Sequence, residues 1–399
     1  MTIAKNLGVV GIKEEVTEGT FVAPDSTTSY VAPIEIELVP AVELLERTIL
    51  NSGLGKASPK LGVKSSNGSI SVEQRGSGVE GAQTDAHSLI KATLGGNREI
   101  TSQNTSKSSG NTDQVLAIED ADIGDYTVGD IVCVLESGDH FVSPITVVVT
   151  TGGSATITLL RTRAAGVFSN SVVISKSQMY FPSNAIADYP TLSVSYYKAD
   201  TKRAAGAGMR CSSMALENWS TGQLSNWAFG LDGLSFTEVD GASPHSGTIV
   251  FDDETPASIL SACVYQNATS VDLNEFSFSI ENSIGFSTST CSANGRIASR
   301  FNAQRTITAN INPYSDATSV QNFTDFDNGN SFSLFAYSAN PSGTSGELDL
   351  GSIVGYYFPS CMITNLGTGD VDGLITDDLT LSCDGGSAGS DKEIYIGII

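Results

Sequence analysis

The stretch NEFSFSIEN, residues 274–282, alternates apolar and polar side chains along most of its length. Phe276, Phe278 and Ile280 point to one side of an extended chain, and serine or glutamate stands between and beside them. Successive side chains of a β-strand point to opposite faces of its sheet. The stretch therefore predicts an antiparallel strand with one face in a core and the other in water.

The same alternation recurs in stretches that lie far apart in the chain: IEIELV (34–39), RTITANIN (305–312) and DLTLSC (378–383). Glycine accounts for 40 of the 399 residues, and serine and threonine are frequent throughout. Such a composition favours many short strands joined by turns. The sequence therefore predicts an all-β fold with one helix, built as an antiparallel β-sandwich or barrel.

The segment 84–94 predicts the helix. A residue suited to capping a helix, Thr84 or Asp85, stands at its start, and Gly95 follows its end. His87 lies off the apolar face, and we interpret it as an exposed histidine. The apolar residues that recur at helical spacing are Ala86, Leu89, Ile90 and Leu94.

The motif GSGVEG, residues 76–81, matches the G-x-G-x-x-G pattern of a dinucleotide-binding turn. A strand that precedes such a turn is buried on both faces and reads as a continuous apolar run. The preceding stretch SISVEQR (69–75) instead alternates and ends in polar residues. We therefore interpret the glycines as a turn between a strand and a helix, and we expect no bound cofactor.

The composition and the strand pattern of the chain change twice along its length, which indicates an insertion. A polar stretch (101–113) reads as a linker, and short Val/Ile/Thr strands separated by Asp/Gly turns follow it. We predict that 114–178 forms an inserted small β-barrel or immunoglobulin-like domain that decorates a larger β domain. The two parts of that larger domain are then 1–113 and 179–399.

The charge balance and the residue types argue against several function classes. The net charge is −23 and no basic stripe is present, which argues against tight binding of nucleic acid. The six cysteines form no C-x-x-C pair and lie at no ligand spacing to a histidine, so we expect free thiols and no metal. No serine or cysteine lies in a nucleophile motif, and we expect no enzymatic activity. The sequence contains no run of about 18 apolar residues, so it predicts no membrane-spanning helix.

Several segments carry, in order, the motifs of a known family. GIKEEVTEGTFVAP (11–24) follows a G-x-K-E-E-x-x-x-G-T-x-x-A-P pattern, and a long loop rich in Gly, Ser and Lys (47–66) comes after it. EGAQTDAHSLIKATLG (80–95) fits the family's helix, and 196–234 carries an arginine-glycine step into a strand and then a hairpin that ends in Gly-Leu. In this order, the segments resemble the major tail tube proteins of tailed, siphophage-type bacteriophages.

The resemblance implies a tail-tube-type fold, in which two antiparallel sheets pack together with one helix alongside. It also implies that six subunits form a ring, that their inner sheets join into one barrel, and that the rings stack into a tube through which DNA leaves the virion. The expected partners are other copies of the chain and other tail proteins, namely the tape measure, terminator and distal tail proteins. The expected location is the virion tail, after assembly in the host cytoplasm.

Two sets of residues are candidates for the work of such a tube. An acidic lumen would repel phosphates and let DNA slide. For the lumen we expect the carboxylates on the polar faces of the strands that flank the long loop: Glu35, Glu37 and Glu73. For contacts between rings we expect the bases of that loop, which contains no acid: Arg47, Lys56, Lys60 and Lys64.

Three other interpretations remain open from the sequence. The negative charge can serve solubility alone, and the loop can be merely solvated. The chain can also be a carbohydrate- or receptor-binding β-module on a virion or cell surface, because it is rich in Ser, Thr and Gly and carries an insert. Against the binding module, the tryptophans that most often stack on sugars, Trp219 and Trp227, lie outside the insert.

Overall fold

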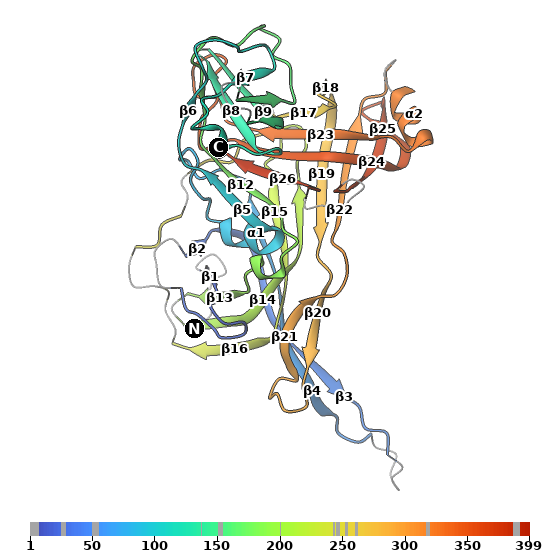
Figure 1. The fold of residues 1–399 in the computed structure, drawn as a ribbon. Coiled ribbons are helices and arrows are strands. Elements are labelled where there is room, and N and C mark those ends of the chain that lie inside the picture. Colours follow the sequence, from blue (N-terminus) through green and yellow to red (C-terminus); the bar gives the residue numbers. More distant parts are fainter. Residues whose placement is uncertain are drawn as a thin grey trace.

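The computed structural model describes residues 8–24, 29–49, 56–136, 138–150, 155–199, 201–241, 244, 248–251, 254–259, 262–316, 320–385 and 392–399. Across these residues the chain is mostly antiparallel β-strand, which confirms the all-β prediction (Figure 1). Eighteen strands are joined by hydrogen bonds into one network, and six strands form a separate sheet.

The main sheet contains the alternating stretches that predicted it. Its strands are, in order across the sheet, β3 (Pro33–Leu45), β4 (Lys60–Glu73), β15 (Asn226–Gly233), β14 (Lys202–Glu217), β19 (Leu273–Glu281), β22 (Thr306–Pro313), β25 (Leu374–Cys383) and β24 (Val354–Val371).

Two long strands connect this sheet to further strands. The first half of β14 pairs with β13 and β16, and a small sheet continues from there: β2 (Tyr30–Val31), β1 (Gly8–Glu14), β13 (Leu192–Lys198) and β16 (Ser235–Asp240). The first half of β24 lies between two other groups: β23 (Ser331–Ser338), β17 (Ala262–Gln266) and β18 (Thr269–Val271) on one side, and β26 (Tyr395–Ile398), β12 (Ser177–Pro182) and β5 (Gly95–Ile100) on the other.

One hydrophobic core lies against one face of the main sheet. Its largest side chains include Trp227, Phe229, Phe276 and Phe278, which are all buried. The indole N–H of Trp227 donates a 2.7 Å hydrogen bond to the hydroxyl of Tyr356, so these two buried side chains satisfy each other's polar groups. The core therefore forms on the apolar side of the strands that alternate in the sequence.

Helix α1 (His87–Leu94) closes one side of this core, but it is shorter than the predicted 84–94. Neither Thr84 nor Asp85 caps its first turn with a side chain, because Asp85 pairs with Arg75 at 2.9 Å instead. His87 is half-buried rather than exposed, and its Nδ1 lies 2.8 Å from the hydroxyl of Tyr180. The predicted cap and the predicted exposure of His87 are therefore wrong.

The prediction of a single helix is also wrong. A second helix, α2 (Val320–Asn328), lies beside β24 and β25 (Figure 1). Helices are usually recognised by an apolar face that turns toward the core. In α2 the buried residues are Asn322 and Asp325, so this signal is missing from the sequence.

The glycines of GSGVEG form a turn between β4 and α1. Gly78 and Gly81 have positive φ angles of 74° and 72°, a conformation that favours glycine. A Cβ atom on Gly76 would lie 1.8 Å from the carbonyl oxygen of Gly351. The glycines thus permit close packing of two backbone segments within the chain.

The separate sheet has its own hydrophobic core. Its strands are β6 (Asn104–Thr105), β11 (Val173–Ile174), β8 (Ile131–Glu136), β9 (Asp139–Val149), β10 (Thr156–Leu159) and β7 (Val115–Ala117). Two 3₁₀ turns and one further hairpin complete the described elements: η2 (Ile123–Asp125), η3 (Ile186–Asp188), β20 (Ile284–Thr288) and β21 (Arg296–Phe301).

The segment 101–113, which we predicted as a linker, is part of this sheet. It contributes β6, and its buried polar residues have partners: Asn104 donates to Asp125 at 3.0 Å, and Ser106 accepts from the backbone of Val172. The sheet thus extends beyond the N-terminal side of the predicted insert 114–178. The chain enters and leaves it on neighbouring strands, because β5 pairs with β12.

The six-stranded sheet packs on the first half of β24 and the strands beside it. Buried side chains of β8 and β9 share a cluster with side chains of β17, β23 and β24. The guanidinium of Arg161 lies between them, 4.4 Å from the ring centre of Phe141 and 4.1 Å from that of Tyr265. Such cation–π contacts are strongest where water is excluded.

Candidate assembly surfaces

The three carboxylates predicted for the lumen lie on one face of the main sheet. Glu35 stands opposite Ser71, and Glu37 stands opposite Ser69, in the pairing of β3 with β4. Glu73 lies on the same side of β4 as these serines, because side chains alternate along a strand. Glu35 and Glu37 are exposed, and Glu73 is half-buried.

This face continues across the sheet as a polar surface, which we call the carboxylate face. Pairing of the strands places on it small, polar or acidic residues from β15, β14, β19, β22 and β25: Asn226, Ala228, Gly230, Asp232, Ala215, Glu217, Glu275, Ser277, Ser279, Glu281, Thr306, Thr308, Asn310, Asp378, Thr380 and Ser382. The opposite side of the same strands is the buried core.

The charges of the carboxylate face are mostly negative. At the positions named on β15, β14, β19, β22 and β25, the one neighbouring base is Arg210, which stands opposite Asp232. Arg210 is buried, and its guanidinium donates to Ser299 and to the carbonyl of Tyr189.

On the arm, Lys60 stands opposite Leu45, on the side of β3 that carries Glu37. The carboxylate of Glu73 lies 3.8 Å from the guanidinium of the half-buried Arg75, which also pairs with Asp85. Acids nevertheless outnumber bases at the described positions of this face. Alternation in the sequence indicated each polar strand face, but not that these faces adjoin.

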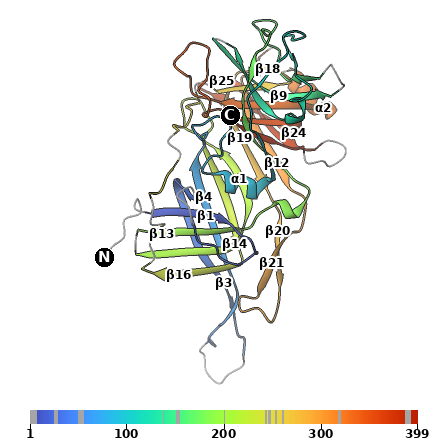
Figure 2. The same cartoon turned by 60° about the vertical axis from the view of Figure 1, so that its left-hand side comes forward.

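The β3–β4 hairpin projects from the body as an arm (Figures 1 and 2). The predicted loop 47–66 is shorter in the structure, because β4 already begins at Lys60. Lys60 and Lys64 lie on this strand, whereas Arg47 and Lys56 lie in the segments that flank residues 50–55, which are outside the described part. All of these bases are exposed.

The arm is less basic than the loop sequence suggested, because acids from β3 and its end lie beside it. Lys56 pairs with Glu46 at 2.6 Å, and the Glu43 side chain lies next to Gly62. The predicted bases still outnumber these acids. The arm also exposes apolar side chains, including Val42, Leu44, Leu45, Ile49 and Leu61.

The base of the arm is braced by the β20–β21 hairpin. The backbone N–H of Lys64 donates a 3.0 Å hydrogen bond to the carbonyl of Asn294. Val63 packs against the backbone of Gly295, which has a φ of 78°. At the base of the arm, β4 is therefore held both by β3 and by the β20–β21 hairpin.

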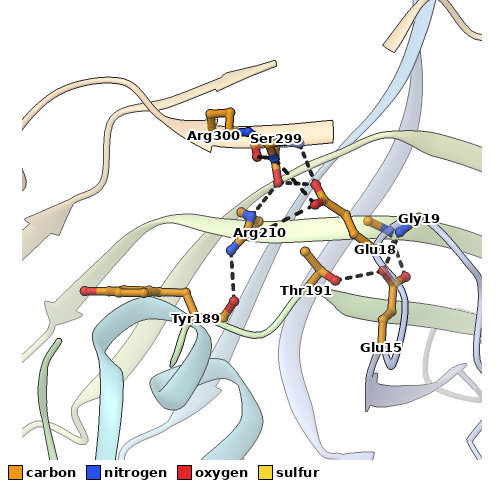
Figure 3. Close-up of polar contacts among 9 residues, drawn as sticks. Glu15, Glu18, Gly19, Tyr189, Thr191, Arg210, Ser299 and Arg300 are labelled. Carbon is orange, nitrogen blue, oxygen red and sulfur yellow. Dashed lines mark hydrogen bonds and ion pairs between the residues drawn. The ribbon is translucent and has the colours of Figure 1, made fainter. Parts of the chain in front are cut away.

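The G-x-K-E-E motif forms an anchor for the N-terminal segment (Figure 3). One carboxylate, that of Glu15, accepts hydrogen bonds from the backbone of Gly19 and Gly208 and from the hydroxyls of Thr191 and Ser193, at 2.8–2.9 Å. Hydrogen bonds to a charged acceptor are the strong ones in proteins. The motif thus fastens the turn after β1 to both β13 and β14.

A second acid of the same segment continues this network toward β21. Glu18 accepts from the backbone and hydroxyl of Ser299, and its carboxylate lies 3.9 Å from the guanidinium groups of Arg210 and Arg300. Arg210 donates at 2.9 Å to the carbonyl of Tyr189 (Figure 3). Burial lowers the pKa of Arg210, and Glu18 opposes that shift. The motif is visible in the sequence, but the residues that Glu15 and Glu18 contact are not.

The comparison with family models decides the identity of this architecture. A model described as phage tail tube protein matches residues 5–385, which is nearly the whole chain. The chain belongs to the phage tail tube protein family. No curated protein matches it. This tail tube protein is thus a structural protein of the virion tail, whose family assembles into a tube with other tail proteins.

Two observations concern other kinds of site. In the part of the chain that the structure describes, no helix is long and apolar enough to cross a membrane. Over those same residues, no three side chains of His, Cys, Asp or Glu are grouped so that they could hold a metal ion.

Proposed function

We propose that the chain is a tail tube subunit that forms stacked rings, most simply of six copies, with the carboxylate face lining a channel for DNA. The observation that supports this proposal is the carboxylate face itself, which carries Glu35, Glu37 and Glu73 together with carboxylates from four further strands, β15, β14, β19 and β25. We propose no enzymatic role for the protein.

The negative charge of the carboxylate face suits the passage of DNA rather than its binding. DNA carries one negative charge per roughly 1.7 Å of helix axis, and proteins that bind it tightly place Lys and Arg against the phosphates. A surface on which carboxylates outnumber bases repels the same phosphates. DNA in such a channel would therefore slide without being held.

The edges of the main sheet support closure into a ring. Among the described strands, β3 pairs only with β4, and residues 363–371 of β24 pair only with β25. Open edges are liabilities that proteins cover or join. Pairing the β3 edge of one copy with the β24 edge of the next would close the sheets into one barrel and remove both edges.

The arm extends away from the sheet, and we propose that it contacts the neighbouring ring. Its exposed leucines and its bases Arg47, Lys60 and Lys64 suit a surface that is partly apolar and acidic. We further propose that rings form in the host cytoplasm, and that the tube meets tape measure, terminator and distal tail proteins.

The burial of the two tryptophans is a further argument against the carbohydrate-binding alternative. Trp219 and Trp227 are 3% and 0% exposed, so neither can stack on a sugar at the surface. The decisive experiment for the proposal is electron microscopy of purified protein at high concentration and of virions. We expect rings or tubes with a central channel. A protein that stays monomeric, in virions without such a tube, would contradict the proposal.

A further inference from the structure

Helix α2 has the reverse of the usual orientation. Its polar residues Asn322 and Asp325 are 7% and 6% exposed, whereas Val320, Phe323 and Phe326 are 69%, 59% and 40% exposed. Helices of soluble proteins normally turn their apolar stripe toward the core. The exposed stripe of α2 therefore needs an explanation.

The polar residues that α2 buries are held by hydrogen bonds. Asp325 accepts from Gln321 at 2.6 Å and from Asn330 at 3.1 Å, and Asn322 donates to Asp377 of β25 at 3.3 Å. A buried polar side chain with its partners in place carries little penalty. The single chain can therefore keep α2 in this orientation and leave its phenylalanines outside.

Two more exposed apolar residues belong to the same end of the molecule. Leu374 and Ile375 begin β25, and each is 59% exposed. The carbonyl of Ile375 accepts a 2.9 Å hydrogen bond from Ser315, shortly before α2, and Asp377 contacts the helix itself. We call the five exposed residues the α2 patch: Val320, Phe323, Phe326, Leu374 and Ile375. Contiguous apolar patches on a soluble protein mark interaction sites.

The charges around the α2 patch have one sign. From Thr306 to Asp391 the sequence contains no Lys, Arg or His, and every charged residue in it is an acid. Asp327, Asp370 and Asp372 are exposed on α2 and on the nearby β24–β25 turn. A partner for this patch should therefore be apolar and positively charged.

The arm of a second copy has this chemistry. Leu44, Leu61 and Ile49 are 60%, 63% and 52% exposed near its far end, and Arg47 and Lys60 stand among them. The arm and α2 lie at opposite ends of the molecule in both views (Figures 1 and 2). One chain therefore presents an apolar, basic projection at one end and an apolar, acidic surface at the other.

We propose that the α2 patch of one copy receives the arm of the next copy. Contacts between two different surfaces of identical chains are heterologous, and they build rings or open filaments. The inference rests on the proposed tube function and deepens it, because it names the surface on which the arm docks. The leucines would cover the phenylalanines of α2, and the bases would face its acids.

Cross-linking between copies tests this contact. Two proteins are made in a Cys291→Ser background, which removes the exposed native thiol: one carries Leu61→Cys and the other Phe323→Cys. They are mixed under conditions in which the wild type forms tubes and are oxidised with a small disulfide reagent. We expect covalent Leu61→Cys with Phe323→Cys dimers at least tenfold above the dimers that either protein forms alone.

The outcomes separate this inference from the proposed function. Tubes without the mixed dimer, or with equal amounts of all dimers, would overturn the docking of the arm on α2 and leave the tube function standing. If the wild type forms neither rings nor tubes, the proposed function fails and the inference fails with it.

A second variant tests the patch without cysteines. Phe323→Asp should reduce the amount of sedimentable tube at least tenfold, whereas Val167→Asp, an equally polar change at an exposed valine on the six-stranded sheet side, should leave it unchanged. The thermal unfolding midpoints of both variants serve as the folding control. Equal tube formation by folded Phe323→Asp would contradict the proposed contact.

Discussion

The backbone N–H of Gly208 donates a 2.8 Å hydrogen bond to Oε1 of Glu15, although 193 residues separate them in the chain. Gly208 has a φ of 65°, which is favourable for glycine and opens the backbone of β14 toward the carboxylate. This contact explains why the G-x-K-E-E segment of the family motif matters: it holds the N-terminal turn against the strand that connects the two parts of the fold.

Replacing Glu15 with alanine should lower the free energy of unfolding by about 3 kcal/mol, because hydrogen bonds to charged groups contribute roughly 1.5–3 kcal/mol each and several donors lose their acceptor. The control is Glu14→Ala, which removes only a partly exposed ion pair with Lys91 and should cost less than about 1 kcal/mol. Chemical denaturation measures both values. Equal losses in the two variants would show that Glu15 is not an anchor.

His87 should make stability depend on pH. Burial, with a smaller contribution from Lys91, lowers its pKa from 6.5 to about 4. The unfolded chain therefore binds a proton below pH 6.5 that the folded chain refuses until about pH 4, so the stability present above pH 6.5 is lost as the pH falls through this window. We expect His87→Gln to remove about 1–2 kcal/mol of this dependence, after a discount for partial exposure.

The comparison of wild type and His87→Gln isolates this residue, since carboxylates titrate in the same window in both proteins. Urea denaturation at pH 7, 5.5 and 4 provides the measurement. Parallel stability curves for the two proteins would contradict the assignment.

The cysteines should differ widely in reactivity. Burial raises the pKa of Cys211 to about 12 and raises those of Cys133 and Cys361 as well, whereas Cys291 is exposed. The thiolate is the reactive form. At pH 8 we expect iodoacetamide to label Cys291 at least 100-fold faster than these buried thiols. Mass spectrometry of the native and the guanidinium-unfolded protein measures the rates, and similar rates before and after unfolding would be inconsistent with this burial.

Charge reversal on the carboxylate face should change how assembled tubes treat DNA. Glu37→Lys combined with Glu217→Lys places cations among the carboxylates, and we expect the tubes to retain short duplex DNA at low salt and release it at high salt. The control Glu119→Lys makes the same kind of change at an exposed residue on the six-stranded sheet side. Equal retention by control tubes would remove the link between this face and DNA.

The strands could be predicted from the sequence because their local pattern and their final environment agree. Phe276 and Phe278 are buried, and Ser277 between them is half-buried on the other face. Such alternation reports which side of a strand enters the core, but not which strand lies next to it. The sequence therefore indicated Glu37 as a polar-face residue and could not show that Glu217 shares that face.

Other features lack any local signal. Helix α2 buries Asp325 and exposes Phe323, so its pattern contradicts the usual rule and can be understood only with the partners of Asp325 in view. The predicted cap of α1 is wrong for a similar reason, because the side chain of Asp85 pairs with Arg75 and not with the first helical turn. Long-range polar contacts decide these places.

The central claim is that the carboxylate face lines the channel of a tube. A cryo-electron microscopy map of the assembled tube, at a resolution that traces strands, tests it most directly. We expect β3, β4, β15, β14 and β19 to surround the channel, with Glu37, Glu217 and Glu281 pointing into it and Phe278 pointing away. A tube in which this face lies on the outer surface, or is covered by a neighbouring subunit, would contradict the claim.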